Sequence, residues 1–198
     1  MKTENKILMQ RARESLSGKW GLAVGTFAFY ILTVIVLNSV PKVGGIISLV
    51  VLGPVFLGLI IFTLALSRNT DAKFEQIFVG FQDFQRALVA YLWRILFILL
   101  WALLFIIPGI VAAIAYSQTF FILADDKFVN GRDAVKRSKQ MMYGYKWKYF
   151  CLQLRFLGWA LLSILSVGIG FLWLLPYMQV SYAKFYDDLK PSVNNSVV

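Results

Sequence analysis

Charged residues alternate along this chain with long apolar runs, and the alternation is one-sided. Seventeen of the twenty lysines and arginines lie before the first run, at or beyond the end of the last run, or in every second gap between runs. Of the other three, Lys42 lies in an alternate gap, and Arg94 and Arg155 lie inside runs. All ten acidic residues follow the alternation. This pattern is typical of a chain that crosses a bilayer repeatedly and keeps its basic gaps in the cytoplasm.

Composition supports the same class of protein. Apolar residues make up 59% of the 198 residues and charged residues only 15%. So few charged side chains cannot cover the surface of a water-soluble protein of this size. The net charge of +10 then reflects topology and attraction to anionic lipid, so we expect no nucleic-acid partner. The chain has no histidine and a single cysteine, Cys151, so it offers no intramolecular disulfide and no cysteine- or histidine-based metal site. We expect no cofactor.

The apolar runs predict an all-α polytopic membrane protein with six transmembrane helices. The predicted spans are residues 21–40, 46–67, 88–107, 110–124, 149–167 and 171–186. Very short turns rich in glycine and proline follow the first, third and fifth spans, which predicts three helical hairpins with short outer turns. Because five basic residues precede the first span and only Lys42 lies on the opposite side, both termini are predicted to be cytoplasmic.

The remaining segments flank or connect these hairpins. Residues 1–20 are predicted to form a basic amphipathic segment and residues 187–198 a disordered tail, with 21–186 as a single membrane domain. Connectors 68–87 and 125–148 are predicted to contain amphipathic cytoplasmic helices. In the first connector, one helical face carries Phe74, Phe78, Phe81, Phe84 and Leu88, which fits a helix in the lipid headgroups or one packed on the bundle ends.

A second amphipathic helix is expected to begin after Asn130. Asn130 is a favourable N-cap, and Asp133 follows at the position of a capping-box acid. Similar residues precede the first and fifth spans, Ser15 with Gly18-Lys19-Trp20 and Ser138 with Gly144-Tyr145-Lys146-Trp147. The three hairpins are therefore either parallel repeats of one unit or alike by coincidence.

Arg94 and Arg155 are the sharpest candidates for a binding site. Each lies about two helical turns beyond a basic residue at a predicted cytoplasmic boundary, so about 10 Å deep. No carboxylate lies within a span to pair with them. Either the two guanidiniums flank a cytoplasm-facing cavity and bind an anion or a lipid headgroup, or they extend to lipid phosphate without a specific ligand.

Other polar residues carry weaker signals. The basic residues of the third gap are candidate contacts for anionic lipid headgroups: Lys136, Arg137, Lys139, Lys146 and Lys148. Polar residues inside later spans fit interhelical hydrogen bonds or, if they converge, a substrate path: Ser117, Gln118, Thr119, Gln153, Gln179 and Ser181. The six tryptophans fit interfacial anchoring. The pairs Asp125-Asp126 and Asp187-Asp188 fit solvated helix ends or, less simply, a divalent-cation site.

Ordered motifs along the chain resemble a known family. They include Ala12-Arg-Glu-x-Leu16-x-Gly18-x-Trp20, Gly53-Pro54, Phe78-x-Gly80-Phe81, Ile106-Ile-Pro-Gly-Ile110, Ala134-x-Lys-Arg-Ser138, Gly144-Tyr-Lys-Trp147 and Gly168-Ile-Gly-Phe-Leu-Trp-Leu174. In this order they resemble the domain-of-unknown-function 975 family of small bacterial integral membrane proteins. The resemblance implies a six-helix protein of the bacterial cytoplasmic membrane, and it assigns no activity and no catalytic residue.

Two functions are therefore weighed. The first is a non-enzymatic membrane protein whose basic cytoplasmic face engages anionic lipid or a protein partner, with envelope stress or antimicrobial-peptide protection as a possible setting. The second is a small transporter or channel for an anionic or amphipathic solute, acting as a homo-oligomer. A lipid-modifying enzyme ranks third, because no nucleotide-binding glycine loop, nucleophile elbow or metal-ligand cluster is present.

Overall fold

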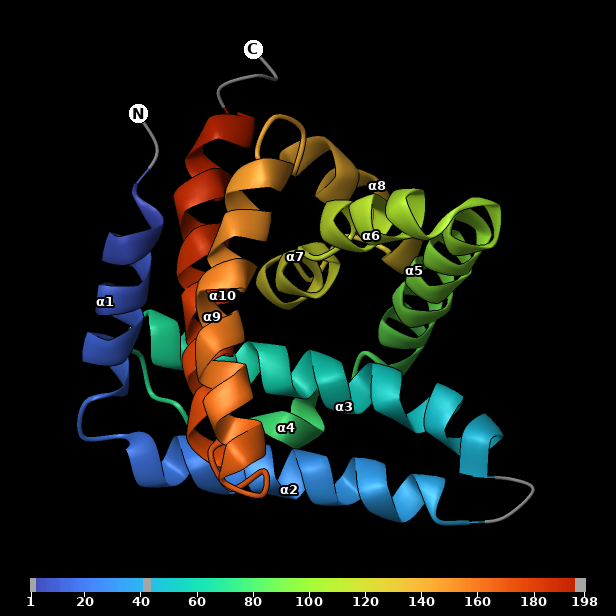
Figure 1. Ribbon diagram of the computed structural model, residues 1–198. Coiled ribbons are helices and arrows are strands. Elements are labelled where there is room, and N and C mark those ends of the chain that lie inside the picture. The colour runs from blue at the N-terminus through green and yellow to red at the C-terminus, as the bar shows by residue number, and fades with distance from the viewer. Residues whose placement is uncertain (1–2, 41–43, 195–198) are drawn as a thin grey trace.

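The computed structural model describes residues 3–40 and 44–194, and within these ranges the chain forms helices joined by turns and loops, without strands. The predicted turn at residues 41–45 and the end of the predicted tail, 195–198, lie partly or wholly outside the described residues. Ten helices follow one another over the described ranges (Figure 1): α1 (Asn5–Leu16), α2 (Trp20–Asn38), α3 (Gly44–Ser67), α4 (Gln76–Val79), α5 (Phe84–Leu104), α6 (Ile106–Ala115), α7 (Thr119–Asp125), α8 (Gly131–Met141), α9 (Lys146–Leu165) and α10 (Phe171–Asn194).

Five segments of the described chain are long and apolar enough to cross a membrane. Their mean hydropathy lies between 1.2 and 2.7, and they overlap the first five predicted spans: Trp20–Asn38, Ile47–Ser67, Phe84–Leu103, Ile106–Asp125 and Lys146–Leu165. The sixth predicted span falls within α10, where Gln179, Lys184 and Asp187 interrupt the apolar run. An all-helical chain with five such segments has the architecture of a membrane protein, and the sixth span stays a prediction.

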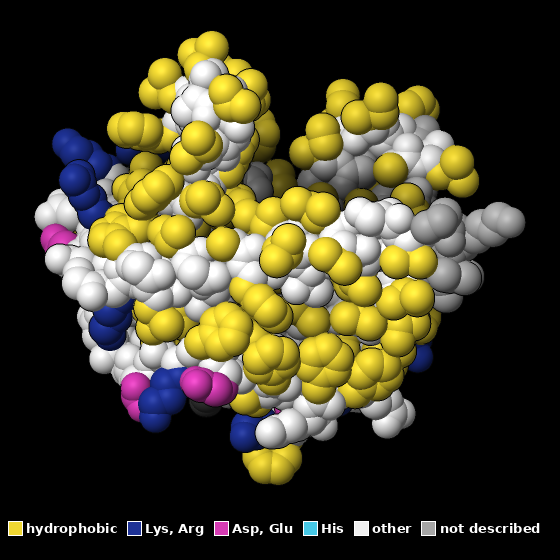
Figure 2. Space-filling view, turned by 90° about the horizontal axis from the view of Figure 1, so that it is seen from below, with side chains coloured by type: hydrophobic (Ala, Val, Ile, Leu, Met, Phe, Trp, Pro, Cys, Tyr) yellow, Lys and Arg dark blue, Asp and Glu magenta, His cyan; other side chains and the backbone are white. Residues whose placement is uncertain are grey.

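Burial separates inner from outer helices. In α3 and in the α6–α7 segment 61% of the apolar stretch is buried, against 17% in α2, 11% in α5 and 22% in α9. The central helix is α3, which contacts α2, α4, α5, α7 and α10. Figure 2 shows hydrophobic side chains covering much of one face and two projecting lobes, with charged side chains gathered toward the margins. An apolar surface of this extent fits contact with lipid.

Helix α1 packs its apolar stripe on protein. Leu8, Ala12 and Leu16 are at most 1% exposed, and the helix lies along α10. The side-chain amide of Asn5 donates to the carbonyl oxygen of Lys148 (2.9 Å), and the Thr3 hydroxyl donates to Asp188 (2.6 Å). The N-terminal segment is therefore held beside the start of α9 and the C-terminal part of α10.

The first connector is not one amphipathic helix. Between α3 and α5 only the short helix α4 forms, because the chain is held against α3 by backbone contacts that leave no room for a side chain. A Cβ on Gly58 would lie 2.0 Å from the carbonyl oxygen of Ile77, and one on Gly80 would lie 1.9 Å from that of Pro54. The predicted long helix with five apolar residues on one face is therefore wrong.

The fourth predicted span consists of two helices. The chain reverses at Phe105, whose backbone is extended, and not at Pro108-Gly109. Pro108 instead occupies the first turn of α6, where a missing N–H breaks no helical hydrogen bond. Residues 116–118 then form a turn that separates α6 from α7. The predicted turn position and the continuous fourth helix are therefore wrong.

The second amphipathic helix, α8, begins as expected. The Asn130 side chain accepts the N–H of Asp133 (2.9 Å) and donates to its carboxylate (2.8 Å). Its inner face is buried at Ala134, Val135 and Ser138, against α5 and α7. The predicted cap is confirmed.

The predicted disordered tail is wrong over residues 187–194, which continue α10. Leu189 is fully buried, and Asp187 and Asp188 form ion pairs with Arg68 and Lys148. These tertiary contacts stabilise the last turns of α10, for which the local sequence gives no signal.

Candidate functional site

A cavity of about 460 Å³ lies between the helices. Residues of α2, α3, α5, α6, α7, α9 and α10 line it, together with one residue of the turn between α6 and α7. Its polar lining is Tyr30, Arg94, Ser117, Tyr149, Gln153, Gln179 and Tyr182, and its remaining wall is aromatic and aliphatic. We call this the central cavity. Gln153 is exposed as well as lining it, which indicates that the cavity opens to the outside near α9.

Arg94, on α5, is the one charged residue among those that line the central cavity. Its Nε atom is enclosed and has no hydrogen-bond partner, and its guanidinium carbon lies 5.8 Å from the centre of the Phe120 ring. No ion pair joins Arg94 to an acid within residues 3–40 and 44–194. A partly buried guanidinium without a counter-charge is costly, so an anion in the cavity would stabilise it.

The break between α6 and α7 shapes one side of the cavity. Ser138 of α8 reaches this break: its hydroxyl donates to the carbonyl oxygen of Ala115 (2.9 Å) and accepts the N–H of Gln118 (3.1 Å). Both groups would otherwise be unpaired at the helix ends. Ser117, between them, accepts a hydrogen bond from the Gln118 side chain (2.9 Å) and lines the cavity.

Polar residues from three predicted spans converge here. Ser117, Gln153 and Gln179 were candidates for either interhelical hydrogen bonds or a substrate path, and all three line the central cavity. Tyr30, Tyr149 and Tyr182 also line it, although the sequence marks none of them as a candidate for a binding site. Tyrosine is common at membrane interfaces, so these three carried no distinguishing signal.

The two arginines of the apolar runs have different surroundings. Arg155 is exposed and lines an outer recess with Asn5, Trp147, Lys148 and Cys151. It does not line the central cavity, so the two guanidiniums do not flank one cavity; of the two, Arg94 lines it.

The basic residues of the third gap divide into paired and unpaired ones. Arg137 forms an ion pair with Asp126 (3.1 Å) and Lys148 with Asp188 (3.3 Å). Lys136 and Lys139 are exposed on the outer face of α8, and Lys146 is half-buried at the start of α9. These last three form no ion pair in the described chain, and the same is true of Lys127 and Arg132 in this gap.

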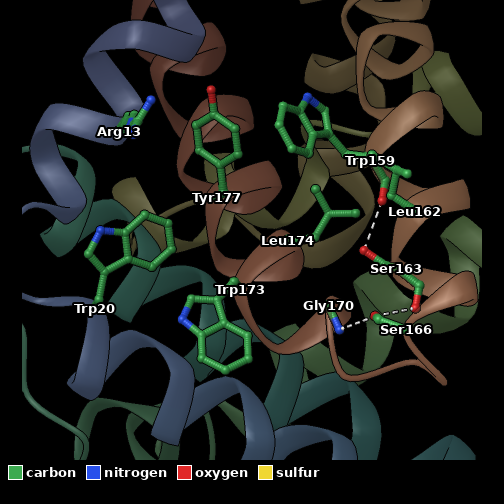
Figure 3. Close-up of a pocket in the computed structure, with 10 residues that line it drawn as sticks. All are labelled: Arg13, Trp20, Trp159, Leu162, Ser163, Ser166, Gly170, Trp173, Leu174 and Tyr177. Carbon is green, nitrogen blue, oxygen red and sulfur yellow. Dashed lines mark hydrogen bonds between the residues drawn. The ribbon is translucent and has the colours of Figure 1, made fainter.

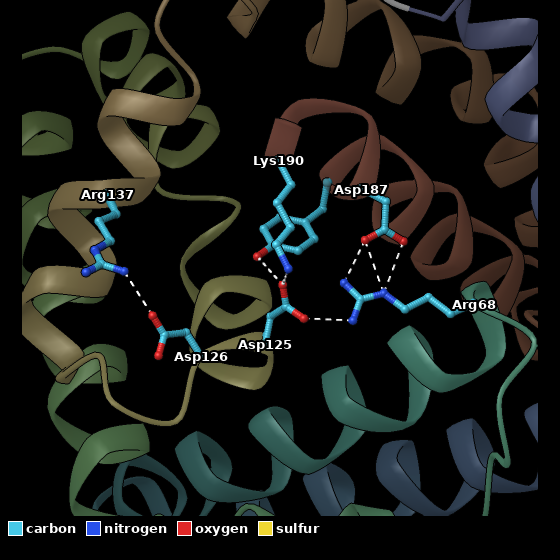
Figure 4. A network of polar contacts seen from close by, with 7 residues as sticks. Arg68, Asp125, Asp126, Arg137, Asp187 and Lys190 are labelled. Atoms are coloured by element: carbon cyan, nitrogen blue, oxygen red, sulfur yellow. Dashed lines mark hydrogen bonds and ion pairs between the residues drawn. The ribbon is translucent and has the colours of Figure 1, made fainter. Parts of the chain in front are cut away.

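An ion network joins the ends of α3, α7 and α10 (Figure 4). Arg68 contacts Asp125 and Asp187, each at 2.7 Å, while Lys190 and the Tyr186 hydroxyl also bind Asp125. Burial lowers the pKa of Arg68, but its hydrogen bonds to Asp187 and Asp125 outweigh this and raise the pKa above its ordinary value. We call this end of the molecule the charged end.

The paired acids are thus tied into the fold. The Asp125 side chain is only 10% exposed, so the expectation of a solvated helix end is wrong there. Lysine and arginine partners bind all four carboxylates of the two pairs. In the described ranges no three residues among histidine, cysteine, aspartate and glutamate are grouped as a metal site would require.

Three of the six tryptophans meet on the outside of the molecule. Trp20 at the start of α2 faces Trp159 and Trp173 of α9 and α10 across a groove of about 440 Å³ (Figure 3). Arg13, Leu174 and Tyr177 complete its main lining. We call it the aromatic groove.

Together these features define an integral membrane protein with a cavity between its apolar helices, into which polar side chains of several helices project. The chain belongs to a family described as "Protein of unknown function (DUF975)", whose model matches residues 1–115 and 103–192. No curated protein and no solved structure matches the chain. The resemblance found in the ordered motifs is therefore confirmed.

Proposed function

We propose that this protein binds a small anionic, amphipathic solute in the central cavity and carries it within or across the membrane. The observation that carries the proposal is Arg94, a guanidinium that lines the central cavity without an acid among the lining residues. An anionic group of the solute supplies the missing counter-charge. The neutral hydroxyl and amide groups of the cavity can hydrogen-bond the same anion.

The remaining lining argues for an apolar body on this solute. Phe27, Phe56 and Phe121 form aromatic walls, and Leu59 and Ile60 add aliphatic surface. The volume of about 460 Å³ falls within the range of about 300–1,000 Å³ that small-molecule pockets occupy. A monoanion with a short hydrocarbon or aromatic body fits both the charge and the surface.

The proposed role includes no chemical step. The chain has no histidine to act as a general base. The carboxylates of Asp125-Asp126 and Asp187-Asp188 are bound by lysine and arginine side chains. Binding and movement of the solute therefore account for the polar residues of the cavity.

A thermal-shift measurement tests the proposal with decanoate as the probe and decanol as its neutral counterpart. The protein is reconstituted in zwitterionic nanodiscs. We expect decanoate to raise the unfolding temperature of the wild type more than decanol does, since a ligand at a hundred times its Kd stabilises by about 2.7 kcal/mol. Arg94→Gln should abolish the difference. Arg155→Gln, which removes a comparable arginine outside the cavity, should keep it, and equal shifts for Arg94→Gln and wild type would contradict the proposal.

The basic face of α8 supports a second candidate function, engagement of anionic lipid or of a protein partner. Lys136 and Lys139 project from α8 opposite its buried face, where Ala134 and Val135 pack inward. Such a helix can lie against an anionic membrane surface. Envelope stress or antimicrobial-peptide protection remains a suggested setting for this function.

Orientation decides whether that face meets the inner leaflet. We propose a bacterial cytoplasmic membrane location, with both termini and α8 on the cytoplasmic side; the bonds of Thr3 and Lys148 to Asp188 support one common side. Single cysteines at Lys139 and Phe105, in a Cys151→Ser background, test it with a membrane-impermeant maleimide. Labelling of the Phe105 position in intact cells and of the Lys139 position only in inverted vesicles is expected. The reverse pattern would contradict the orientation.

A further inference from the structure

The aromatic groove is a second, separate recess, on the outer side of α10 from the central cavity. Leu174 and Tyr177 of α10 line the groove, whereas Leu175 and Met178 line the cavity. The mouth of the groove faces outward along α9, one of the outer helices, because Trp159, Leu162 and Trp173 are each more than half exposed. In a bilayer these side chains contact lipid.

Backbone turns fix both walls of the groove. Gly18 adopts φ +75° between α1 and α2, a conformation that glycine favours, and this sharp turn brings Arg13 and Trp20 to the same recess. On the opposite wall, Gly168 adopts φ +83°, and the Ser166 hydroxyl accepts the N–H of Gly170 (3.0 Å). Most side chains of Figure 3 therefore lie on helices that these two turns join, α1 to α2 and α9 to α10.

The one charged group among the residues that line the groove lies at its Arg13 end. Arg13 is exposed, has no ion pair within the described residues and lies beside Tyr177 (Figure 3). At the other end, Ser163 and Ser166 already donate to the carbonyl oxygens of Trp159 and Ser163. No acidic residue lines the groove. It thus presents a cation at one end and an apolar, indole-lined surface along the rest.

We infer that the aromatic groove holds one anionic phospholipid of the surrounding bilayer. The lipid phosphate binds the Arg13 guanidinium, and one acyl chain lies over Leu174 between Trp159 and Trp173. Arginine binds phosphate through two parallel N–H groups, and indole rings suit the boundary between headgroups and acyl chains. The site selects lipid by headgroup charge, since its apolar part contacts any acyl chain alike.

Native mass spectrometry tests this inference on protein released from nanodiscs made of equal parts phosphatidylglycerol and phosphatidylcholine. We expect the wild type to retain one phosphatidylglycerol more firmly than phosphatidylcholine. Arg13→Gln should reduce retained phosphatidylglycerol several-fold and leave phosphatidylcholine unchanged. Lys73→Gln removes an exposed charge outside the groove and should not alter retention. Arg94→Gln should not alter it either, which separates this site from the central cavity.

A second variant tests the apolar wall of the groove, and unfolding temperatures show whether either variant disturbs the fold. Trp173→Ala should lower retention of both lipids, because it removes the apolar wall and leaves Arg13 in place. Unfolding temperatures of both groove variants should stay near that of the wild type, since both side chains are exposed. Equal retention of the two lipids by the wild type, or an Arg13→Gln variant that retains phosphatidylglycerol as firmly as the wild type, would overturn the inference.

Discussion

The Ser138 hydroxyl donates a hydrogen bond to the carbonyl oxygen of Ala115 across 2.9 Å, and so joins amphipathic helix α8 to the end of α6. A similar relationship recurs at the start of the chain, where the Ser15 hydroxyl of α1 donates to the carbonyl oxygen of Ser67 at the end of α3 (3.3 Å). Both helices then turn through a glycine of positive φ, Gly18 at +75° and Gly144 at +78°. This correspondence supports an internal repeat in which a short amphipathic helix and a glycine turn precede an apolar helix.

Replacing Ser138 by alanine tests whether this hydroxyl stabilises the broken helix. The change leaves the carbonyl of Ala115 and the N–H of Gln118 without their partner in a buried position, and each unsatisfied group costs about 1–3 kcal/mol. We expect a clear fall in the free energy of unfolding, measured by denaturant titration in a fixed detergent. Ser39→Ala, which removes an exposed hydroxyl bonded within α2, serves as the control and should have little effect.

The ion network predicts that neutralising Asp125 lowers the stability of the folded protein. Asp125→Asn weakens its contacts with Arg68, Lys190 and Tyr186, and hydrogen bonds to charged groups contribute about 1.5–3 kcal/mol each when shielded from water. Because Arg68 and Lys190 are themselves partly exposed, we expect a loss near the lower end, seen as a lower unfolding temperature. Asp71→Asn removes an exposed ion pair with Lys73 and should leave the unfolding temperature unchanged. Equal effects of the two variants would argue against a structural role for the network.

Two glycines, Gly58 and Gly80, let α3 and α4 approach at backbone contact distance, and a larger residue at Gly80 tests this contact. A Cβ at position 80 would lie 1.9 Å from the Pro54 carbonyl oxygen, so Gly80→Ala must separate α4 from α3. We expect a destabilisation of about 3 kcal/mol or more, or loss of folded protein, because backbone on both sides leaves little room to relax. Gly25→Ala meets no atom within 4 Å and should be tolerated. Expression and monodispersity on size-exclusion chromatography distinguish the two variants.

Much of the fold follows from local sequence. The five apolar segments and the Asn130 cap depend on nearby residues, so hydropathy and capping rules locate them. The short helix α4 depends on the close approach of Gly58 and Gly80 to distant backbone. The break after Ala115 likewise depends on Ser138, a distant residue. Sequence patterns carry no information about such contacts, and both features were missed.

In the candidate site, too, some features follow from local sequence and others depend on tertiary packing. Arg94 and Arg155 give the same sequence signal, an arginine inside an apolar run at similar depth. Which of them faces the cavity depends on how α5 and α9 are rotated against their neighbours, and this is set by tertiary packing. The tyrosines of the cavity could not be told from interfacial ones, because convergence of side chains from different helices has no signature in one sequence.

Direct binding of radiolabelled decanoate to the nanodisc-reconstituted protein tests the central claim, that Arg94 binds an anion in the central cavity. We expect Arg94→Gln to weaken binding by about tenfold or more, as the loss of one charge-assisted contact implies. Arg94→Lys should restore part of the affinity, and Arg155→Gln should match the wild type. Wild-type affinity in the Arg94→Gln protein would contradict the account.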